Sequence, residues 1–426
     1  MPVISQMMAM LASFIGVLGS LYCLAEAFTV HRLMRLKGIR TTSLVATESG
    51  AKVLTLPAHP CTNDNSPAVT IFKPLRNATP GLRRDLETLF AQDYTGATEI
   101  IFGLHSESDP AKEIVDQLKE QYSNIKVVVS PKMHGTNAKV TNLLNMVSHA
   151  CHPIFVICDG DTAVPPDWLS GLVKTLEAPG VGLVSCLYSG VPERPLFWPI
   201  MSAMGMSYSF LPNVVLAAAT GLEVPCLGAT MVIRQSTLAE VGGFERFANV
   251  LADDYELGRA VRAKGYSVAL LMSVVHHNAG EKQISDFFAH ELRWARTIRM
   301  INPTGYVLSA ITYNVGFACL GVIANPTAVA LCILAFAIGA RTVLQHLVDR
   351  AFACWSGPAW LLPLRDLLSF IVFSLSFTSR KVRWGGRVFH ASLSEPRPDF
   401  RPVSGLFRPG TPQGPKPAGA GGTGCS

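Results

Sequence analysis

The stretch Ile154-Phe155-Val156-Ile157-Cys158-Asp159-Gly160-Asp161 decides the fold. Its first five residues are apolar and rich in β-branched side chains, which is typical of a buried strand. The strand runs directly into two carboxylates, Asp159 and Asp161, and Gly160 allows the backbone to turn tightly between them. One carboxylate is a candidate contact for a ribose, and the other for a divalent cation bridging two phosphates. The alternative is a surface turn, because Asp-Gly is a common turn dipeptide.

Around this stretch, from residue 67 to residue 300, short apolar runs alternate with helical stretches. The expected strands cover 68–72, 99–104, 125–129, 154–158, 181–187 and 231–233. The expected helices cover 81–91, 111–122, 139–150, 166–176, 254–263 and 284–299. This alternation predicts an α/β domain with three layers and a mostly parallel sheet. Ligands bind beyond the carboxyl ends of strands in such sheets, which is where the two aspartates lie.

The N-terminal segment 7–30 is almost uniformly apolar. At 1.5 Å per residue a helix of this length crosses a hydrocarbon core of about 30 Å. A signal peptide needs a basic n-region, and no Lys or Arg precedes Arg32, so we interpret the segment as an uncleaved transmembrane anchor. The basic residues after it predict a cytosolic position for the next domain.

A second apolar zone covers 305–378 and divides into the runs 305–324, 327–347 and 360–377. The last run contains Arg365 and Asp366, which a spanning helix would bury at a high cost. The run therefore either places this pair at the membrane interface or is re-entrant, and the topology after residue 305 stays open. The tail 395–426 is rich in Pro and Gly, and we expect it to be disordered.

The composition supports a membrane-attached enzyme. Of the 426 residues 49% are hydrophobic and 15% are charged, against about 25% charged residues in an average soluble protein. Much of the net charge of +6 lies beside the apolar segments, where basic side chains meet lipid headgroups. The chain shows no nucleic-acid-binding motif, so we expect no nucleic-acid partner. Its ten cysteines form no CxxC pair and indicate buried thiols in a reducing compartment.

Two further motifs carry candidate chemistry. Asp254, in Ala252-Asp253-Asp254-Tyr255-Glu256, is a candidate general base, and the alternative is that the acids cap a helix. In His290-Glu291-Leu292-Arg293-Trp294, the first, fourth and fifth residues share one helix face. Arg293 is suited to clamp a diphosphate, and Trp294 to pack against a sugar or nucleotide. The alternative is an interfacial helix that Trp and Arg anchor at the headgroups.

The three motifs in this order resemble the catalytic set of a GT-A glycosyltransferase, and more closely that of the ceramide glucosyltransferase family, glycosyltransferase family 21. That family has a D-x-D-like site, a later acidic pair, and a (Q/R)xxRW motif before C-terminal membrane segments. The resemblance covers about residues 7–385. It is supported by the runs 72–75, 137–143 and 241–244.

The resemblance implies a GT-A type fold, a divalent metal (Mg²⁺ or Mn²⁺) at Asp161 and a catalytic base at Asp254. The donor and nucleotide contacts that it implies are Asp159, Lys139, His290, Arg293, Trp294 and Glu107. Two positions depart from the family pattern. His290 replaces the first Gln or Arg of the (Q/R)xxRW motif, and Ser106 stands where the family has its first aspartate, so Glu107 or Asp109 takes that place.

The function implied is inverting transfer of a sugar from a UDP-sugar to a lipid hydroxyl at a bacterial inner membrane, with a cytosolic catalytic domain. The runs 251–254, 290–294 and 362–370 are most similar to the hopanoid-biosynthesis branch, which transfers N-acetylglucosamine to bacteriohopanetetrol. The alternative acceptor is ceramide, with UDP-glucose as the donor. A UDP-binding scaffold without catalysis is the alternative from another class. A transporter would leave the α/β domain unexplained.

Overall fold

The structure is a computed structural model, and it describes residues 2–35, 42–47, 50–55, 66–379, 381–384 and 387–390. The tail 395–426, which the sequence predicts to be disordered, lies outside the described residues. The continuous stretch 66–379 contains both the catalytic candidates and the apolar C-terminal runs.

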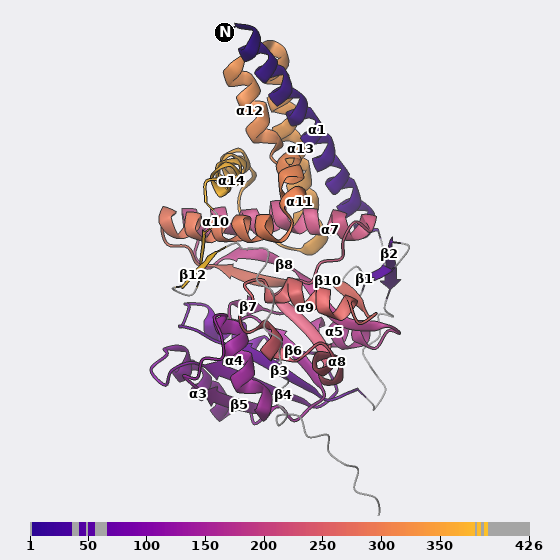
Figure 1. The fold of residues 1–426 in the computed structure, drawn as a ribbon, viewed down its shortest axis with the longest axis vertical. Coiled ribbons are helices and arrows are strands. Elements are labelled where there is room, and N and C mark those ends of the chain that lie inside the picture. The colour runs from indigo at the N-terminus through magenta and orange to yellow at the C-terminus, as the bar shows by residue number, and fades with distance from the viewer. Residues whose placement is uncertain are drawn as a thin grey trace, which may run out of the picture. The chain divides into compact units, whose positions relative to one another are not determined.

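A ten-stranded mixed sheet forms the core of the α/β part of the structure, and the apolar helices lie to one side of it (Figure 1). Its strands are β1 (Thr42–Thr47), β2 (Gly50–Thr55), β3 (Val69–Pro74), β4 (Thr98–Leu104), β5 (Ile125–Val129), β6 (Ile154–Cys158), β7 (Thr162–Ala163), β8 (Val181–Pro192), β9 (Thr230–Arg234) and β10 (Ser267–Ala279). The order is β2-β1-β10-β8-β9-β6-β3-β4-β5, and β7 pairs with β10. The six strands expected from the sequence are all present. A separate hairpin joins β11 (Lys381–Trp384) to β12 (Arg387–His390).

The expectation of a mostly parallel sheet needs correction, because the sheet is mixed. Strands β6, β3, β4 and β5 pair in parallel, but β9 is antiparallel to both of its neighbours, β6 and β8. The reason lies in the connection between β8 and β9. This connection contains the helical segment 197–220, and it returns the chain so that β9 runs antiparallel to β8 with Met231 opposite Ser185.

Helices cover both faces of the sheet, as the three-layer prediction requires. Alternate residues of one strand enter different cores: Ile71 of β3 joins one apolar cluster and Phe72 joins the other. The first cluster includes residues of α2 (Leu82–Glu87), α3 (Ala111–Gln121) and α5 (Trp168–Leu176). The second includes residues of α4 (Ala138–Met146), α8 (Gln235–Glu240) and α9 (Asp253–Arg262).

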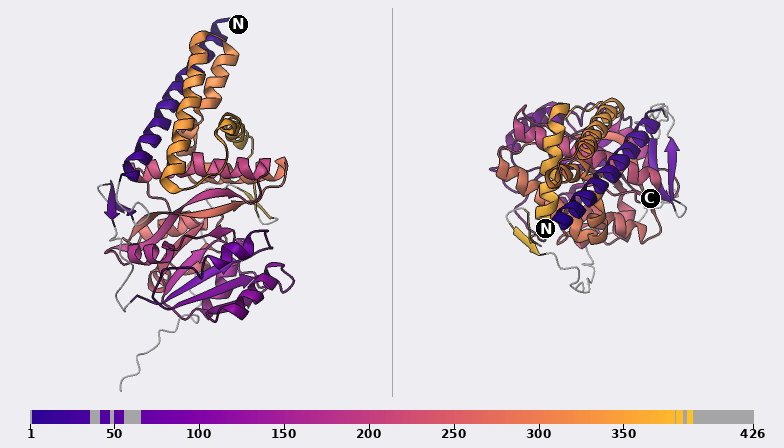
Figure 2. Two further views of the ribbon diagram at one scale, coloured as in Figure 1. Left: turned by 180° about the vertical axis from the view of Figure 1, so that it is seen from behind. Right: turned by 90° about the horizontal axis from the view of Figure 1, so that it is seen from above.

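Several helices are long and apolar enough to cross a membrane. Within the described residues the candidate spans are Ser5–Met34, Phe197–Thr220, Ala328–Phe352 and Ala359–Ser376, with a bent pair as a fifth. The helices involved are α1 (Pro2–Met34), α6 (Phe197–Gly205), the π-helical turn η3 (Met206–Phe210), α7 (Leu211–Thr220), α11 (Pro303–Leu308), the 3-10 turn η5 (Ser309–Thr312), α12 (Asn314–Ala324), α13 (Ala328–Phe352) and α14 (Leu362–Ser376). Helices α1, α12 and α13 pack together and extend away from the sheet (Figure 2).

The run 305–324, expected as one segment, is bent by 65° between Thr312 and Asn314. Two hydroxyls explain the break, because they compete for backbone carbonyls near the end of the first half. Ser309 Oγ donates to the carbonyl of Tyr306 at 2.7 Å, and Thr312 Oγ1 donates to the carbonyl of Ser309 at 2.8 Å. The apolar run is therefore two short helices, α11 and α12, on either side of a 3-10 turn.

Candidate active site

A cavity of about 790 Å³ lies at the carboxyl ends of β3 and β6, against helix α10 (Ile284–Ile301). It collects residues from distant parts of the chain. Seven of the eight predicted site residues line it: Lys139, Asp159, Asp161, Asp254, His290, Arg293 and Trp294. The eighth, Glu107, does not.

Asp159 and Lys139 form an ion pair in this cavity, with 2.5 Å between Nζ and Oδ1. Lys139 lies in the first turn of α4, whose cap is Asn137, and its ammonium also donates to the carbonyl of Gly228 at 2.9 Å. Burial alone would lower the pKa of Lys139, but the nearby carboxylates outweigh it and raise the pKa, so the side chain stays protonated. A fixed positive charge therefore lies beside the aspartates that come after β6.

Asp161 lies opposite His277 of β10, with 3.3 Å between Oδ1 and Nδ1. Enclosure in the cavity would raise the pKa of Asp161, but the His277 imidazole outweighs it and holds the pKa well below its usual range. The carboxylate is therefore ionised and is 44% exposed. Oδ1 is buried against His277, so a ligand in the cavity meets the exposed remainder of the carboxylate.

This arrangement could bind a divalent metal only if phosphate oxygens of the donor supplied further ligands. No group of three or more His, Cys, Asp or Glu side chains within the described part of the chain could hold an ion by itself. Mg²⁺ is commonly bound by one or two carboxylates together with substrate phosphates. Asp161 supplies such a carboxylate, whereas Asp159 is already paired with Lys139.

A buried lysine that sequence analysis missed holds the segment carrying the aspartates. Lys73 of β3 is fully buried, and its Nζ donates to the carbonyls of Asp159 at 2.5 Å and Thr162 at 2.7 Å. The same Nζ lies 3.2 Å from the sulfur of Cys158. A buried ammonium is tolerated only when its protons are bonded, and here three partners take them. Lys73 thus fixes both ends of the Asp159–Thr162 turn.

Replacing Lys73 by Met should lower the free energy of unfolding by about 2 to 6 kcal/mol, because two buried carbonyls lose their donor. Chemical denaturation of the detergent-solubilised protein measures this effect. The exposed Lys119 on α3 provides the matched control, since Lys119→Met alters no buried hydrogen bond. Equal stability of the two variants would contradict the assigned role of Lys73.

Asp254 lies in the first turn of α9 and lines the cavity. No side chain caps α9, whose N-cap is Ala252, but Asp253, Asp254 and Glu256 lie in its first turn, where acids complement the helix dipole. Asp254 Oδ1 accepts a hydrogen bond from the backbone N–H of Tyr255 at 2.8 Å, whereas Asp253 Oδ1 accepts one from Asn137 Nδ2 at 3.1 Å. Burial, then the charge of Asp253, raises the pKa of Asp254 to about 6. This value suits a general base at neutral pH.

Helix α10 forms the opposite wall of the cavity. The Trp294 ring meets His290 edge to face at 5.0 Å between centroids and also contacts Tyr188 and Phe210 at 6.2 Å and 6.1 Å. His290 Nδ1 pairs with Glu281 Oε1. Among the described residues no carboxylate lies within ion-pairing distance of Arg293, although it lines the cavity. The wall thus offers an aromatic surface and a cation.

Comparison with known protein families gives a match to the model described as "Glycosyl transferase family 21" over residues 33–395. The chain belongs to glycosyl transferase family 21. This confirms, at the level of the family, the glycosyltransferase expected from the sequence. The match covers the sheet, the cavity and most of the apolar helices.

Relatives of this family 21 chain include two ceramide glucosyltransferases. Ceramide glucosyltransferase 1 of Caenorhabditis elegans is 27% identical over 235 residues, 54% of this chain and 49% of the relative. Ceramide glucosyltransferase of Komagataella phaffii is 30% identical over 115 residues, 26% and 22% of the two chains. The chain spans about half the length, or less, of these curated relatives.

Among solved structures, the family 21 chain is similar to the mannosyltransferase PcManGT of Pyrobaculum calidifontis in complex with GDP-Man and Mn²⁺. The identity is 20%, and the match covers 87% of this chain and 98% of the other at a TM-score of 0.48.

The structure separates Glu107 from the rest of the expected family 21 site. Its side chain is 76% exposed and lies 3.7 Å from Lys112 Nζ, outside the cavity. The alternative, Asp109, is engaged at the start of α3 through the backbone N–H of Ala111 at 2.9 Å. The residue of this segment that lines the cavity is His105, directly after β4.

His277 and Tyr188 are among the further cavity residues that sequence analysis missed. A signal for His277 exists, because the apolar run 268–275 ends in two histidines and resembles the run that ends in the aspartates. Tyr188 lies within β8 and has no comparable signal, since an aromatic residue in a strand is ordinary core.

Proposed function

We propose that this family 21 chain transfers a sugar from a UDP-sugar to the hydroxyl of a lipid, with inversion at the anomeric carbon. The observation that carries the proposal is the content of one cavity. The cavity contains Asp254, whose pKa is about 6, and the ionised carboxylate of Asp161. It also contains the Arg293 guanidinium, which has no carboxylate partner among the described residues. These are the groups that acceptor deprotonation and diphosphate binding require.

The reaction is a single displacement. Asp254 takes the proton of the acceptor hydroxyl as its oxygen attacks the anomeric carbon. The bond from that carbon to the UDP oxygen breaks, and UDP leaves with the electron pair. Arg293 and Lys139 hold the diphosphate through charge-assisted hydrogen bonds. Asp161 would hold a Mg²⁺ or Mn²⁺ ion together with the donor phosphates, and the ion would supply neutralising charge to the diphosphate. One displacement converts an α-linked UDP-sugar into a β-linked product.

The lipid nature of the acceptor is supported by the apolar side of the cavity. Phe210, Trp294, Ile298 and Ile301 line it on the side of the candidate membrane helices. We propose that α1 anchors the chain, that the apolar helices within 305–378 lie in the membrane, and that the domain over 67–300 faces the cytosol of a bacterium. The acceptor hydroxyl then reaches Asp254 from the membrane side.

Two donor and acceptor pairs are consistent with this chemistry. The sequence runs 251–254, 290–294 and 362–370 support N-acetylglucosamine transfer to bacteriohopanetetrol. The ceramide glucosyltransferase relatives support glucose transfer from UDP-glucose to ceramide. Both acceptors present a hydroxyl at the polar end of a large apolar body, and the same cavity chemistry serves either.

The rate should depend on pH through Asp254, which accepts a proton only when ionised. With a pKa of about 6, kcat/KM should be flat above neutral pH and fall about tenfold per unit below pH 6. The sign is set by the raised pKa, since protonation on the acid side removes the base. Initial rates of UDP release from pH 5 to 8 test this, and a rate that rises below pH 6 would contradict it.

Product analysis by mass spectrometry tests the function itself. The purified protein in detergent receives UDP-N-acetylglucosamine or UDP-glucose with Mg²⁺ or Mn²⁺, and bacteriohopanetetrol or ceramide as separate acceptors. An N-acetylhexosaminyl hopanoid supports the first pair, and a hexosyl ceramide the second. UDP binding without any glycosylated lipid would contradict both and favour the scaffold.

A further inference from the structure

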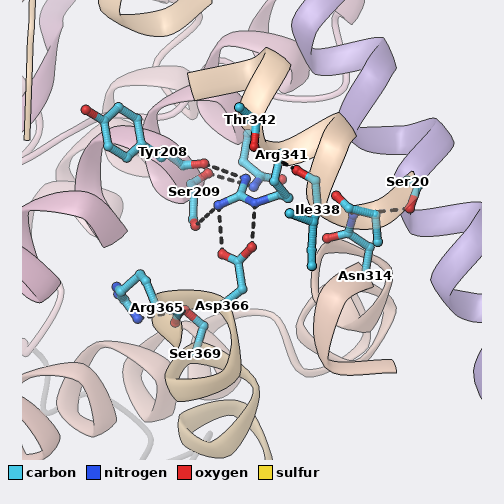
Figure 3. Close-up of polar contacts among 12 residues, drawn as sticks. Ser20, Tyr208, Ser209, Asn314, Ile338, Arg341, Thr342, Arg365, Asp366 and Ser369 are labelled. Atoms are coloured by element: carbon cyan, nitrogen blue, oxygen red, sulfur yellow. Dashed lines mark hydrogen bonds and ion pairs between the residues drawn. The ribbon is translucent and has the colours of Figure 1, made fainter. Parts of the chain in front are cut away.

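Two charged neighbours, Arg365 and Asp366, are buried inside the candidate span Ala359–Ser376 with exposures of 3% and 6%. Charges in such surroundings are tolerated when each has a well-placed partner, and they commonly mark a functional position. The two side chains leave α14 in different directions (Figure 3). They therefore connect α14 to two separate parts of the structure.

Asp366 is bonded to Arg341 of α13. The guanidinium donates from Nε to Oδ2 at 2.8 Å and from Nη2 to Oδ1 at 2.9 Å. The same guanidinium donates to the carbonyl of Tyr208 at 2.6 Å and to Ser209 Oγ at 3.0 Å (Figure 3). Both belong to the π-helical turn η3, where the regular helical hydrogen bonds are interrupted. The turn ends at Phe210, which lines the cavity.

Arg365 is bonded to α10, whose Trp294 contacts Phe210. Its Nη2 donates to Glu291 Oε2 of α10 at 2.9 Å. The guanidinium passes so close to Gly205 of α6 that a Cβ there would lie 1.8 Å from Nη2, so any side chain at this position would displace the guanidinium. Glu291 comes directly after His290 and precedes Arg293 by two residues, and both of these line the cavity.

We propose that Arg365 and Glu291 are positioning residues that hold α10 in register, so that Arg293 and Trp294 meet the diphosphate of the donor. Adjacent residues of α14 thereby hold two neighbouring segments of the cavity lining, η3 through Asp366 and Arg341, and α10 through Arg365. The inference rests on the proposed function, because it takes the donor to be a nucleoside diphosphate sugar.

The test compares the affinities for UDP and uridine, measured by titration calorimetry on the full chain in detergent. Only UDP carries the diphosphate, so the ratio of the two affinities reports on the groups that contact the diphosphate, and the Arg293→Gln background isolates the share of Arg293. Glu291→Gln should lower this ratio about tenfold and leave uridine binding unchanged. In an Arg293→Gln background the same substitution should have no further effect, because Glu291 acts through Arg293.

Arg299→Gln is the matched control. Arg299 also ties α10 to the C-terminal region, donating to the carbonyl of Ser379 at 2.6 Å, but it does not line the cavity. This variant should keep the wild-type ratio. Arg365→Lys, which keeps the charge and loses the planar fork, is a second variant should Glu291→Gln fail to fold, and it should lower the ratio as well.

The proposal is overturned if Glu291→Gln and Arg365→Lys keep the wild-type ratio. It is also overturned if Arg299→Gln lowers the ratio equally, or if the loss persists in the Arg293→Gln background. Wild-type protein that binds UDP no more tightly than uridine would overturn the donor site of the proposed function. Tight UDP binding combined with unaffected variants would overturn the positioning role alone.

Discussion

Asp254→Asn is expected to lower the rate of sugar transfer by a factor on the order of 10² to 10⁴, the usual contribution of a general base. Asparagine has nearly the same shape and still accepts the hydrogen bond from Tyr255, so the fold and UDP affinity should persist. Radiolabelled sugar transfer to the lipid, together with calorimetric UDP binding, measures both quantities. The residual activity of this variant should no longer fall below pH 6, because the group that titrates there has been removed.

Asp253→Asn is the matched control for this substitution. Asp253 is the neighbour whose negative charge raises the pKa of Asp254, and its carboxylate bonds to Asn137. Its removal should leave transfer at neutral pH largely intact and move the acid limb below pH 6. A large loss at neutral pH in Asp253→Asn, with a mild one in Asp254→Asn, would exchange the roles of the two residues.

Asp161→Asn should produce the second large loss. It removes the ionised carboxylate expected to share a divalent ion with the donor diphosphate. Several kcal/mol of transition-state stabilisation correspond to a rate loss on the order of 10² to 10³. Activity titrated against Mn²⁺ should saturate at higher metal concentration in the variant, and chelation should abolish the wild-type rate.

Asp116→Asn controls for the loss of a carboxylate outside the cavity. Asp116 lies on α3, where it pairs with Lys112 at 2.6 Å, and its substitution should change neither the rate nor the metal dependence. Wild-type metal dependence in Asp161→Asn would show that the ion, if used, is held elsewhere.

The sequence predicts the carboxylates of the cavity well because each belongs to a strong local pattern. Asp159 and Asp161 end a continuous apolar run, and Asp254 opens an amphipathic helix, so strand and helix periodicity place them at the carboxyl edge. Lys73 could not be predicted in the same way. Its partners lie 85 to 89 residues away, and only the register of β3 beside β6 brings them together.

The direction of β9 and the contacts of α14 could not be predicted from the sequence either, because both depend on how distant segments pack. The antiparallel insertion of β9 depends on where the preceding helical segment runs, which periodicity does not encode. Sequence reasoning identifies Arg365 and Asp366 as costly to bury. It does not identify Glu291 and Arg341 as the residues that neutralise them, because these pairings depend on helix packing.

The anomeric configuration of the lipid product tests the central claim most directly. Proton NMR of the glycosylated lipid made from an α-linked UDP-sugar measures the coupling between the anomeric and neighbouring protons. The large coupling of a β-linked gluco-configured sugar is the result expected from one displacement assisted by Asp254. An α-linked product would contradict that mechanism, and the absence of any glycosylated lipid would contradict the function.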